Sequence, residues 1–274
     1  MEAKRMYGSF YGWYLKCQSD TQTLAVIPAV HRVGCTRTCS IQVITEDGAW
    51  TIPFSAKEFR HAKQSMMLGK NRFGTRGIRL AIQTPEVNIR GKLNFGPLSP
   101  LKYDIMGPFS LVPFMECRHG VWSMRHSVNG TVYLNGKKYV FQNAIGYWEG
   151  DRGRSFPKEY AWTQCLFPEG SLMLSVADIP MAGVHFTGII GVVYWKGKEY
   201  RLATYLGAKA VLIMFFCYCA LESTAGLWAS SFLVLYHHLD AETAASFASL
   251  FYIGITVGRG INGFIAMKLK DTQM

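Results

Sequence analysis

The composition of the chain changes at residues 207–209, from a charged, turn-rich sequence to an apolar one. This change is the strongest constraint on the fold. Before it, short apolar runs alternate with turn residues and scattered charges. After it, residues 210–274 hold only three of the chain's 29 basic residues and four of its 18 acidic ones, so residues 1–209 carry a net charge of +12. Two sequence patterns this different rarely belong to a single domain with one hydrophobic core. We therefore predict two units, 1–209 and 210–274.

Residues 10–209 read as β structure, because their apolar runs are short and rich in β-branched and aromatic residues. Examples are TLAVIPAV, CSIQVIT, GIRLAIQT and SLMLSVADI. Three hairpin signatures, TEDGAW, LNGKKY and WKGKEY, carry Gly at or beside the turn. The segment SAKEFRHAKQSMM is the one stretch expected to form a short helix. The pattern predicts a mainly β, antiparallel barrel or sandwich.

The surplus of basic charge has two simple explanations, an anionic partner or an anionic membrane surface. The Lys and Arg residues are scattered singly between apolar residues, and no nucleic-acid-binding motif occurs. We therefore predict no nucleic-acid partner.

The seven cysteines include the pair CTRTC, which could ligate a metal, but no second Cys/His pair has zinc-site spacing. We expect free thiols in a reducing compartment, and no metal site. The N-terminus has no apolar core of signal-peptide length, so we expect the first unit not to be secreted.

Residues 210–235 and 244–267 form two long apolar stretches, joined by a polar turn in which Asp240 is a plausible N-cap. The first stretch would make about 40 Å of helix, enough to span about 30 Å of hydrocarbon. Lysines and arginines flank the outer ends of the pair, which places both ends in the cytoplasm by the positive-inside rule. The pattern predicts a transmembrane hairpin in contact with membrane lipid, with the β unit on the cytoplasmic side. The alternative is a buried helical hairpin of a soluble protein.

Three segments of the β unit are dense in polar and aromatic residues: YGWYLKCQ (11–18), MECRHGVWSMRH (115–126) and GYWEGDRGRSFPKEYAWTQC (146–165). On a strand, Glu116 and Arg118 would share one face and Cys117 and His119 the other. This suits a barrel with a polar patch inside, although an ordinary surface strand with cross-strand ion pairs would look similar. Aromatic residues around acids and bases in the third segment are typical of a pocket lining rather than a plain turn.

The segment EGDRGRSFPKEYAWTQC resembles the signature of the tocopherol cyclase family. GWYLK, FGPLSPLKYDIMGPFSLVPFMECRH and ECRHGVWSMRH are also similar to that family and occur in its order, so the resemblance covers residues 7–209. It implies a lipocalin-like β-barrel and the acid-promoted cyclisation of a prenylated hydroquinone to a chromanol, without a metal or redox cofactor. Gly150 and Arg152 depart from the plant enzymes. The resemblance ends after RLATYLGAK, where further strands would close the second half, so we expect an incomplete barrel with an open edge at 194–204.

The same resemblance suggests roles for individual residues. Asp151 and Glu149 are candidate acids, because an apolar, Trp-lined site favours the protonated carboxyl. His119 and His126 are candidate bases for the phenol proton. Arg152 and Lys158 would hold the quinol oxygens or pair with the carboxylates. The full candidate substrate-binding set is Trp13, Tyr14, Glu116, Trp122, Arg125, Trp148, Arg152, Lys158, Tyr160, Trp162 and Gln164. The expected partner is a lipophilic, prenylquinol-like small molecule.

The tail GLWASSFLVLYHHLDAETAASFASLFYIGITVGRGINGFIAMKL resembles the seventh and eighth helices of a major facilitator superfamily transporter. In a full transporter Glu222 would be a candidate for the substrate or proton site. Two helices cannot enclose a path between two six-helix halves, so we assign no transport activity to this chain.

Two alternatives to a cyclase stay open: a truncated transporter of this superfamily fused to a soluble β domain, and a non-catalytic lipid-binding β-barrel. Since no Gly-, Ser- or Pro-rich linker separates the two parts, we interpret residues 207–209 as a junction of unrelated sequences.

Overall fold

A computed structural model describes residues 8–113, 115–181, 184–209, 221, 224–225 and 228–268. The chain divides into two compact units, Met1–Ala208 and Lys209–Met274. Each unit is described by itself.

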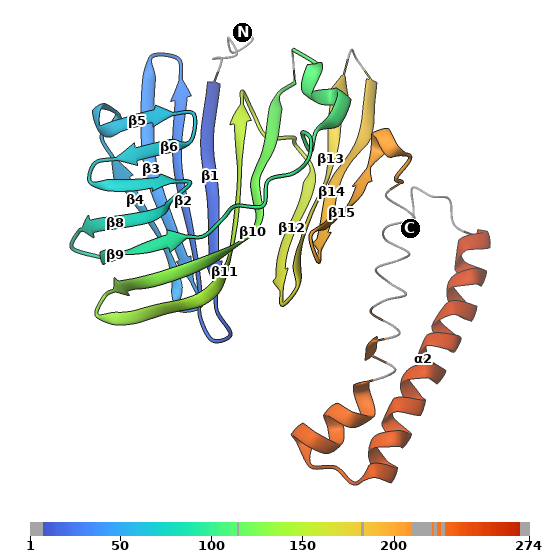
Figure 1. Cartoon of the computed structure of the whole chain (residues 1–274). Coiled ribbons are helices and arrows are strands. Elements are labelled where there is room, and N and C mark those ends of the chain that lie inside the picture. The colour runs from blue at the N-terminus through green and yellow to red at the C-terminus, as the bar shows by residue number, and fades with distance from the viewer. Residues whose placement is uncertain are drawn as a thin grey trace. The chain divides into compact units, whose positions relative to one another are not determined.

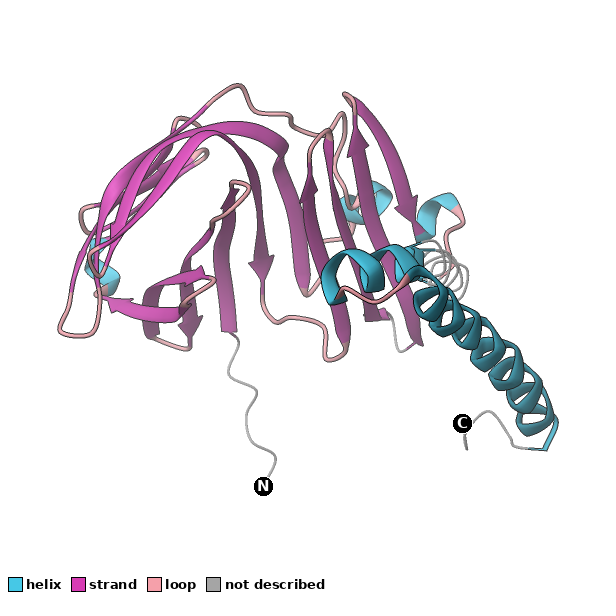
Figure 2. Ribbon diagram, turned by 90° about the horizontal axis from the view of Figure 1, so that it is seen from below, coloured by secondary structure: helices cyan, strands magenta, loops and turns pink. Residues whose placement is uncertain are grey.

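The first unit is built on an 11-stranded antiparallel sheet that curls into a near-closed barrel (Figures 1 and 2). Its strands are β1 (Gly8–Gln18), β2 (Thr23–Val33), β3 (Thr36–Thr45), β4 (Gly48–Phe54), β5 (Phe59–Ala62), β6 (Ser65–Leu68), β7 (Asn71–Gly74), β8 (Gly77–Gln83), β9 (Asn88–Phe95), β10 (Cys117–Leu134) and β11 (Lys137–Gly153). Their order in the sheet is β4-β3-β2-β1-β11-β10-β9-β8-β7-β6-β5. The predicted mainly β, antiparallel barrel is therefore confirmed.

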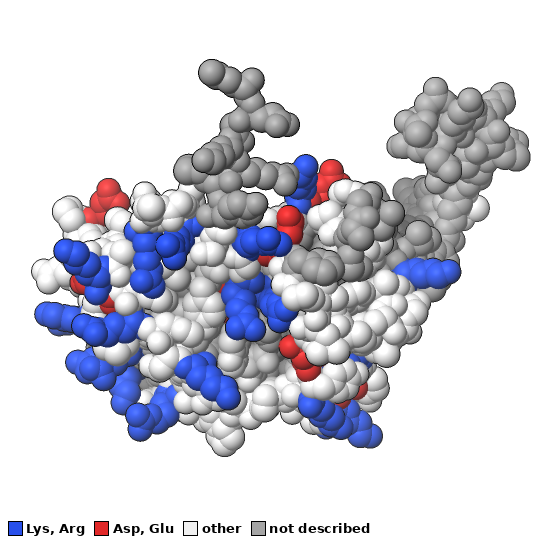
Figure 3. All heavy atoms as spheres, turned by 90° about the horizontal axis from the view of Figure 1, so that it is seen from above, with Lys and Arg blue, Asp and Glu red and all other residues white. Residues whose placement is uncertain are grey.

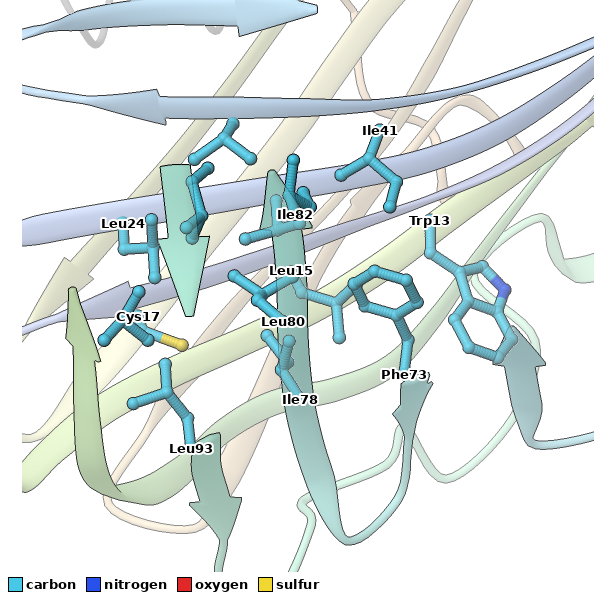
Figure 4. Packing of buried hydrophobic residues seen from close by; sticks show 14 of the residues in the cluster. Trp13, Leu15, Cys17, Leu24, Ile41, Phe73, Ile78, Leu80, Ile82 and Leu93 are labelled. Atoms are coloured by element: carbon cyan, nitrogen blue, oxygen red, sulfur yellow. The ribbon is translucent and has the colours of Figure 1, made fainter. Parts of the chain in front are cut away.

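The barrel's core lies on the concave face of this sheet. Trp13, Leu15 and Cys17 alternate along β1 and are fully buried, as the period of two in a strand requires. They pack against residues from the opposite side of the curl, such as Phe73 of β7 and Leu80 of β8 (Figure 4). Every strand of the curled sheet contributes alternate side chains to the same core. Short apolar runs in the sequence are therefore enough to fill it.

A second, four-stranded sheet packs against the convex face of the first within the same unit. It consists of β12 (Tyr160–Phe167), β13 (Gly170–Met181), β14 (Val184–Trp195) and β15 (Lys198–Ala203), in that order. A second core, which includes Met106, Met124, Tyr147, Met173 and Val192, joins the two sheets. The Ser171 hydroxyl of β13 also donates a 2.6 Å hydrogen bond to the Met124 carbonyl of β10. The two sheets thus fix each other's position.

All three predicted hairpins form. LNGKKY joins β10 to β11, WKGKEY joins β14 to β15, and TEDGAW joins β3 to β4. In the first two, the turn residues have positive φ angles, 48° and 87° at Asn135 and Gly136, and 49° and 77° at Lys196 and Gly197. Such angles match the type I′ turns that best fit the twist of a hairpin. Asn and Gly in the first loop therefore suit its backbone.

The helix predicted over SAKEFRHAKQSMM is wrong. A single 3-10 turn, Ala56–Glu58, begins there and is capped reciprocally by Ser55 and Glu58. The chain then continues as β5 and β6. Met66 and Leu68, two residues apart on β6, both reach the barrel core, so burial of this alternating pair favours a strand over a helix.

Basic side chains are scattered over the face of the first unit that Figure 3 shows. On the face shown in Figure 3, Lys and Arg side chains far outnumber Asp and Glu, with uncharged patches between them. This distribution fits the scattered basic residues of the sequence.

In the second unit, residues 228–237 are helical and α2 spans Ala241–Lys268. The Asp240 carboxylate accepts a 2.8 Å hydrogen bond from the Thr243 amide, which confirms the predicted cap. Glu222 and much of the first predicted apolar stretch lie outside the described residues.

The predicted transmembrane hairpin is not supported. Among the helices that the structure describes, none has both the length and the apolar character needed to cross a bilayer. Ser246, Ser249 and Thr256 interrupt the apolar residues of α2 and turn their hydroxyls back onto carbonyls one helical turn earlier. The predicted membrane location and membrane-lipid partner depended on this hairpin and lose their support with it.

We expect the Trp13→Ala variant to lose about 3–5 kcal/mol of unfolding free energy, because it empties a fully buried indole site. The Trp13 ring packs with its centroid 4.8 Å from that of Trp148 and 5.8 Å from that of Trp122. Urea unfolding followed by circular dichroism measures the change. Trp195→Ala is the control, since this indole is 44% exposed and its loss should cost at most about 1 kcal/mol. Equal losses in the two variants would contradict this assignment of the core.

Candidate active site

The candidate site lies on the convex face of the three central strands β1, β11 and β10. Along β11, Trp148 packs into the barrel core, so Tyr147, Glu149 and Asp151 take the opposite face. The strand register sets Asp151 opposite His119 of β10 and Gly12 of β1. His119 and Asp151, 32 positions apart in the chain, therefore meet on one face of the sheet, beside the much more distant Gly12.

His119 sits between two carboxylates. Its Nδ1 lies 2.8 Å from Oδ1 of Asp151, within hydrogen-bond reach, and its Nε2 lies 3.2 Å from Oε2 of Glu149. Tyr147 donates a 2.6 Å hydrogen bond to the same Glu149 oxygen. The side chains of His119 and Glu149 are 9% and 4% exposed, whereas that of Asp151 is 26% exposed. We call Tyr147, His119, Glu149 and Asp151 the acid–base cluster.

The two carboxylates decide the protonation of the imidazole. Burial alone lowers the pKa of His119, but the charge of Glu149 and the hydrogen bond to Asp151 outweigh it and raise this pKa to about 10. His119 is therefore an imidazolium at neutral pH. Burial and the Glu149 charge also raise the pKa of Tyr147 well above its usual value and that of Tyr14 to about 12, so both phenols stay protonated.

Cys117 adds a weak donor to the cluster. Its Sγ lies 3.6 Å from Oδ1 of Asp151, the oxygen that also faces His119. Burial, together with the Asp151 charge, raises the pKa of this thiol. The thiol therefore stays protonated and is a poor nucleophile.

A cavity of about 470 Å³ opens beside the cluster, between the convex face of the first sheet and the second sheet. His119, Glu149 and Asp151 line it. Most of the other lining residues are apolar or aromatic, among them Tyr14, Met106, Phe109, Phe156, Trp162, Ile179, Phe186, Ile189 and Ile190. A cavity of this size with a few convergent polar groups suits a lipophilic small molecule.

The structure brings part of the predicted site together. Besides the three titratable residues, the cavity is lined by Trp13, Tyr14, Tyr160 and Trp162 of the predicted set. The ring centroids of Tyr14 and Trp162 lie 5.3 Å apart. Glu116, Trp122, Arg125, Trp148, Arg152, Lys158 and Gln164 are not among the lining residues.

Several of these other residues have structural contacts instead. Trp122 and Trp148 stack in the barrel core, with ring centroids 5.6 Å apart. Arg125 donates a 2.9 Å hydrogen bond to the Phe167 carbonyl, which links the two sheets. The buried amide of Gln164, opposite Met173, has no hydrogen-bond partner among the described residues.

His126, the second candidate base, is buried away from the cavity. It packs on Phe95, and its Nδ1 lies 2.9 Å from the Ser123 hydroxyl. That hydroxyl already donates to the Arg125 carbonyl, so His126 must be the donor and its Nε2 is left without a proton. Burial lowers the pKa of His126 to about 4, which keeps the ring neutral.

Two kinds of residue in the candidate site were not predicted from the sequence. Tyr147 precedes Glu149 by two positions, so strand alternation could have placed it on the same face. The lining residues of the second sheet, such as Ile179, Phe186 and Ile189, gave no such signal, because only the packing of the two sheets brings them to the cavity.

Metal ligation has no candidate among the described residues, since no group of three or more His, Cys, Asp or Glu side chains there is arranged to hold an ion. The CTRTC pair is split between an exposed Cys35 and a buried Cys39.

Comparison with known proteins gives only distant similarity of fold. No protein-family model matches the chain. No curated protein matches it either. Among solved structures, a Nitrosomonas europaea protein assigned to AttH shares 11% identity at a TM-score of 0.46, over 72% of this chain and 68% of that one. CghA with Sch210972 shares 10% identity at a TM-score of 0.46, over 71% and 59% of the two chains.

Kievitone hydratase from Nectria haematococca shares 11% identity at a TM-score of 0.45, over 72% of this chain and 64% of that one. The chain thus spans 59–68% of the length of these three proteins. The similarity to the tocopherol cyclase and transporter families stays a prediction from the sequence.

The raised pKa of His119 predicts how stability depends on pH. A histidine has a pKa of about 6.5 when unfolded and His119 about 10 when folded, so its contribution is complete below pH 6.5 and is lost as pH rises toward 10. We expect the wild type to lose more unfolding free energy between pH 7 and pH 10 than His119→Gln, measured by urea unfolding. His126→Gln is the matched control. The folded pKa of His126 is about 4, so this residue contributes fully to stability above pH 6.5 and loses that contribution as pH falls toward 4. Parallel alkaline curves for wild type and His119→Gln would contradict the assignment.

Proposed function

We propose that this protein binds a lipophilic molecule with a phenolic hydroxyl group in the cavity, and that the acid–base cluster transfers protons to and from it. The observation that carries the proposal is the position of His119, held between Glu149 and Asp151 at the wall of a largely apolar cavity. More specifically, we propose acid-promoted cyclisation of a prenylated hydroquinone to a chromanol, as the sequence resemblance to tocopherol cyclases suggests.

The cluster has the groups that this reaction requires. Asp151 is the most exposed of its three charged members and lines the cavity, so it is the group best placed to touch the substrate. The His119 imidazolium can pass its Nδ1 proton to Asp151 across 2.8 Å, which makes Asp151 a neutral acid. Glu149 faces the other imidazole nitrogen and accepts from Tyr147, so it balances charge as the proton moves.

The proposed reaction is an isomerisation in which one proton enters and one leaves. Asp151 delivers a proton to the less substituted carbon of the prenyl double bond next to the ring, which leaves a tertiary cation. The oxygen of the neighbouring phenol attacks that cation, and a C–O bond closes the ring. The phenolic proton returns to the Asp151–His119 pair, so no oxidant, reductant or co-reactant is consumed.

The rest of the cavity suits a cationic intermediate. Apolar walls exclude water that would otherwise trap the cation. The faces of Tyr14 and Trp162, which contact each other beside the cluster, can stabilise positive charge through their ring quadrupoles. The same walls would hold a lipid in a protein without catalysis, which is the alternative function. Only the acid–base cluster distinguishes the two.

We expect Asp151→Asn and His119→Gln each to lower turnover of a prenylated hydroquinone about 10²–10⁴-fold, the usual contribution of a positioned acid or base. Chromanol formation by the full chain is followed by chromatography with mass detection. Asp178→Asn is the matched control: its carboxylate contacts the exposed His185 at 2.6 Å, in a His–Asp pair outside the cavity lining.

Unchanged turnover in Asp151→Asn, with folding confirmed by circular dichroism, would contradict the assigned role of Asp151. Binding of the hydroquinone without turnover in the wild type would support the lipid-binding alternative instead.

A further inference from the structure

A row of small residues leads away from the acid–base cluster across the convex face. The strand register sets His119 opposite Asp151, Asp151 opposite Gly12, Gly12 opposite Ala29, and Ala29 opposite Ser40. These residues come from five neighbouring strands, β10, β11, β1, β2 and β3, and all of them line the cavity. Beyond the two titratable residues, the row therefore contains only a glycine, an alanine and a serine.

Larger side chains flank this row on both sides. On one side, Phe10 lies opposite His31 in the register, and Phe10 also stacks on Phe156 with ring centroids 4.3 Å apart. On the other side are Tyr14 and the pair formed by Ile27 and Gln42. All six residues line the cavity. The small row is thus the floor of a trough, and we call Gly12, Ala29 and Ser40 the trough floor.

The trough opens to solvent at the end away from the acid–base cluster. Apolar residues of the second sheet, such as Ala177, Ile179 and Ile190, also line the cavity. At the far end, His31 and Gln42 are exposed to solvent. Neighbouring strands are about 4.8 Å apart, so the three steps from Asp151 to Ser40 span about 14 Å.

We infer that the trough floor binds an extended apolar chain of the substrate, while the reacting phenol sits at the acid–base cluster. This deepens the proposed function and rests on it. The floor has no charged side chain, and its small residues leave room for a chain that large residues would fill. A fully extended chain advances about 3.6 Å for every three backbone bonds, so about 14 Å holds roughly ten to twelve bonds. The structure therefore assigns the substrate an elongated tail of about this length that runs across the strands.

The test titrates 4-alkylphenols, from ethyl to hexadecyl, into the full chain below their micelle concentrations, with Kd measured by calorimetry. For the wild type we expect affinity to rise roughly two- to fourfold with each added methylene group, because each one leaves water. The rise should level off beyond ten to twelve carbons, where the chain emerges at the open end.

Two variants block the trough at different points. Ala29→Phe fills the middle of the floor, so we expect the decyl phenol to lose at least tenfold in affinity while the ethyl phenol changes less than twofold. Ser40→Phe fills the far end and should weaken only the longest chains. Ile44→Phe is the control, because it places the same aromatic ring on the same face of β3 but outside the cavity lining, and no chain length should respond to it.

The outcomes separate the inference from the function on which it rests. Ethyl phenol binding with no dependence on chain length in the wild type would overturn the trough assignment and leave the phenol site intact. Equal weakening of all chain lengths by Ala29→Phe would also overturn it. Absence of binding by every phenol would overturn the proposed function itself.

Discussion

The antiparallel pairing of β11 with β1 and β10 positions both the barrel core and the acid–base cluster. Side chains alternate along each of these three strands, so one face of the strands faces the barrel core and the other faces the second sheet. Trp13 and Trp148 point into the barrel core, while Tyr147, Glu149 and Asp151 point toward the second sheet. A shift of register by one residue would exchange the two faces, burying carboxylates in the apolar core. Packing of the aromatic core therefore also fixes the position of the acid–base cluster.

The cluster combines burial with opposite charge, so that His119 keeps its proton at neutral pH. Desolvation by itself would neutralise His119, yet two carboxylates at 2.8 and 3.2 Å keep it charged. His126, only seven residues further along β10, has no such partners and is neutral in a similarly buried position. The contrast shows that local charge, rather than burial, decides which histidine of this strand is protonated at neutral pH.

Much of the first unit could be predicted from sequence, and the failures have identifiable causes. The hairpins at Asn135–Gly136 and Lys196–Gly197 follow from local turn chemistry, and they form as expected. The helix expected over residues 55–67 does not form, because the end of this segment belongs to β6, whose alternating Met66 and Leu68 are buried in the barrel core. The transmembrane hairpin was predicted from two long apolar stretches with basic residues at their outer ends, but no helix in the described part of the tail is both long and apolar enough to cross a bilayer.

Local periodicity and turn residues are enough to predict the fold class, the hairpins and the polar, aromatic segments that supply His119, Glu149 and Asp151. Which of those residues meet depends on the folded chain. Cross-strand register pairs His119 with Asp151 and aligns Gly12 with Ala29 and Ser40, and the packing of two sheets brings Ile179 and Phe186 over them. Register and sheet packing arise from burial summed over many distant residues, which no short segment of the sequence encodes.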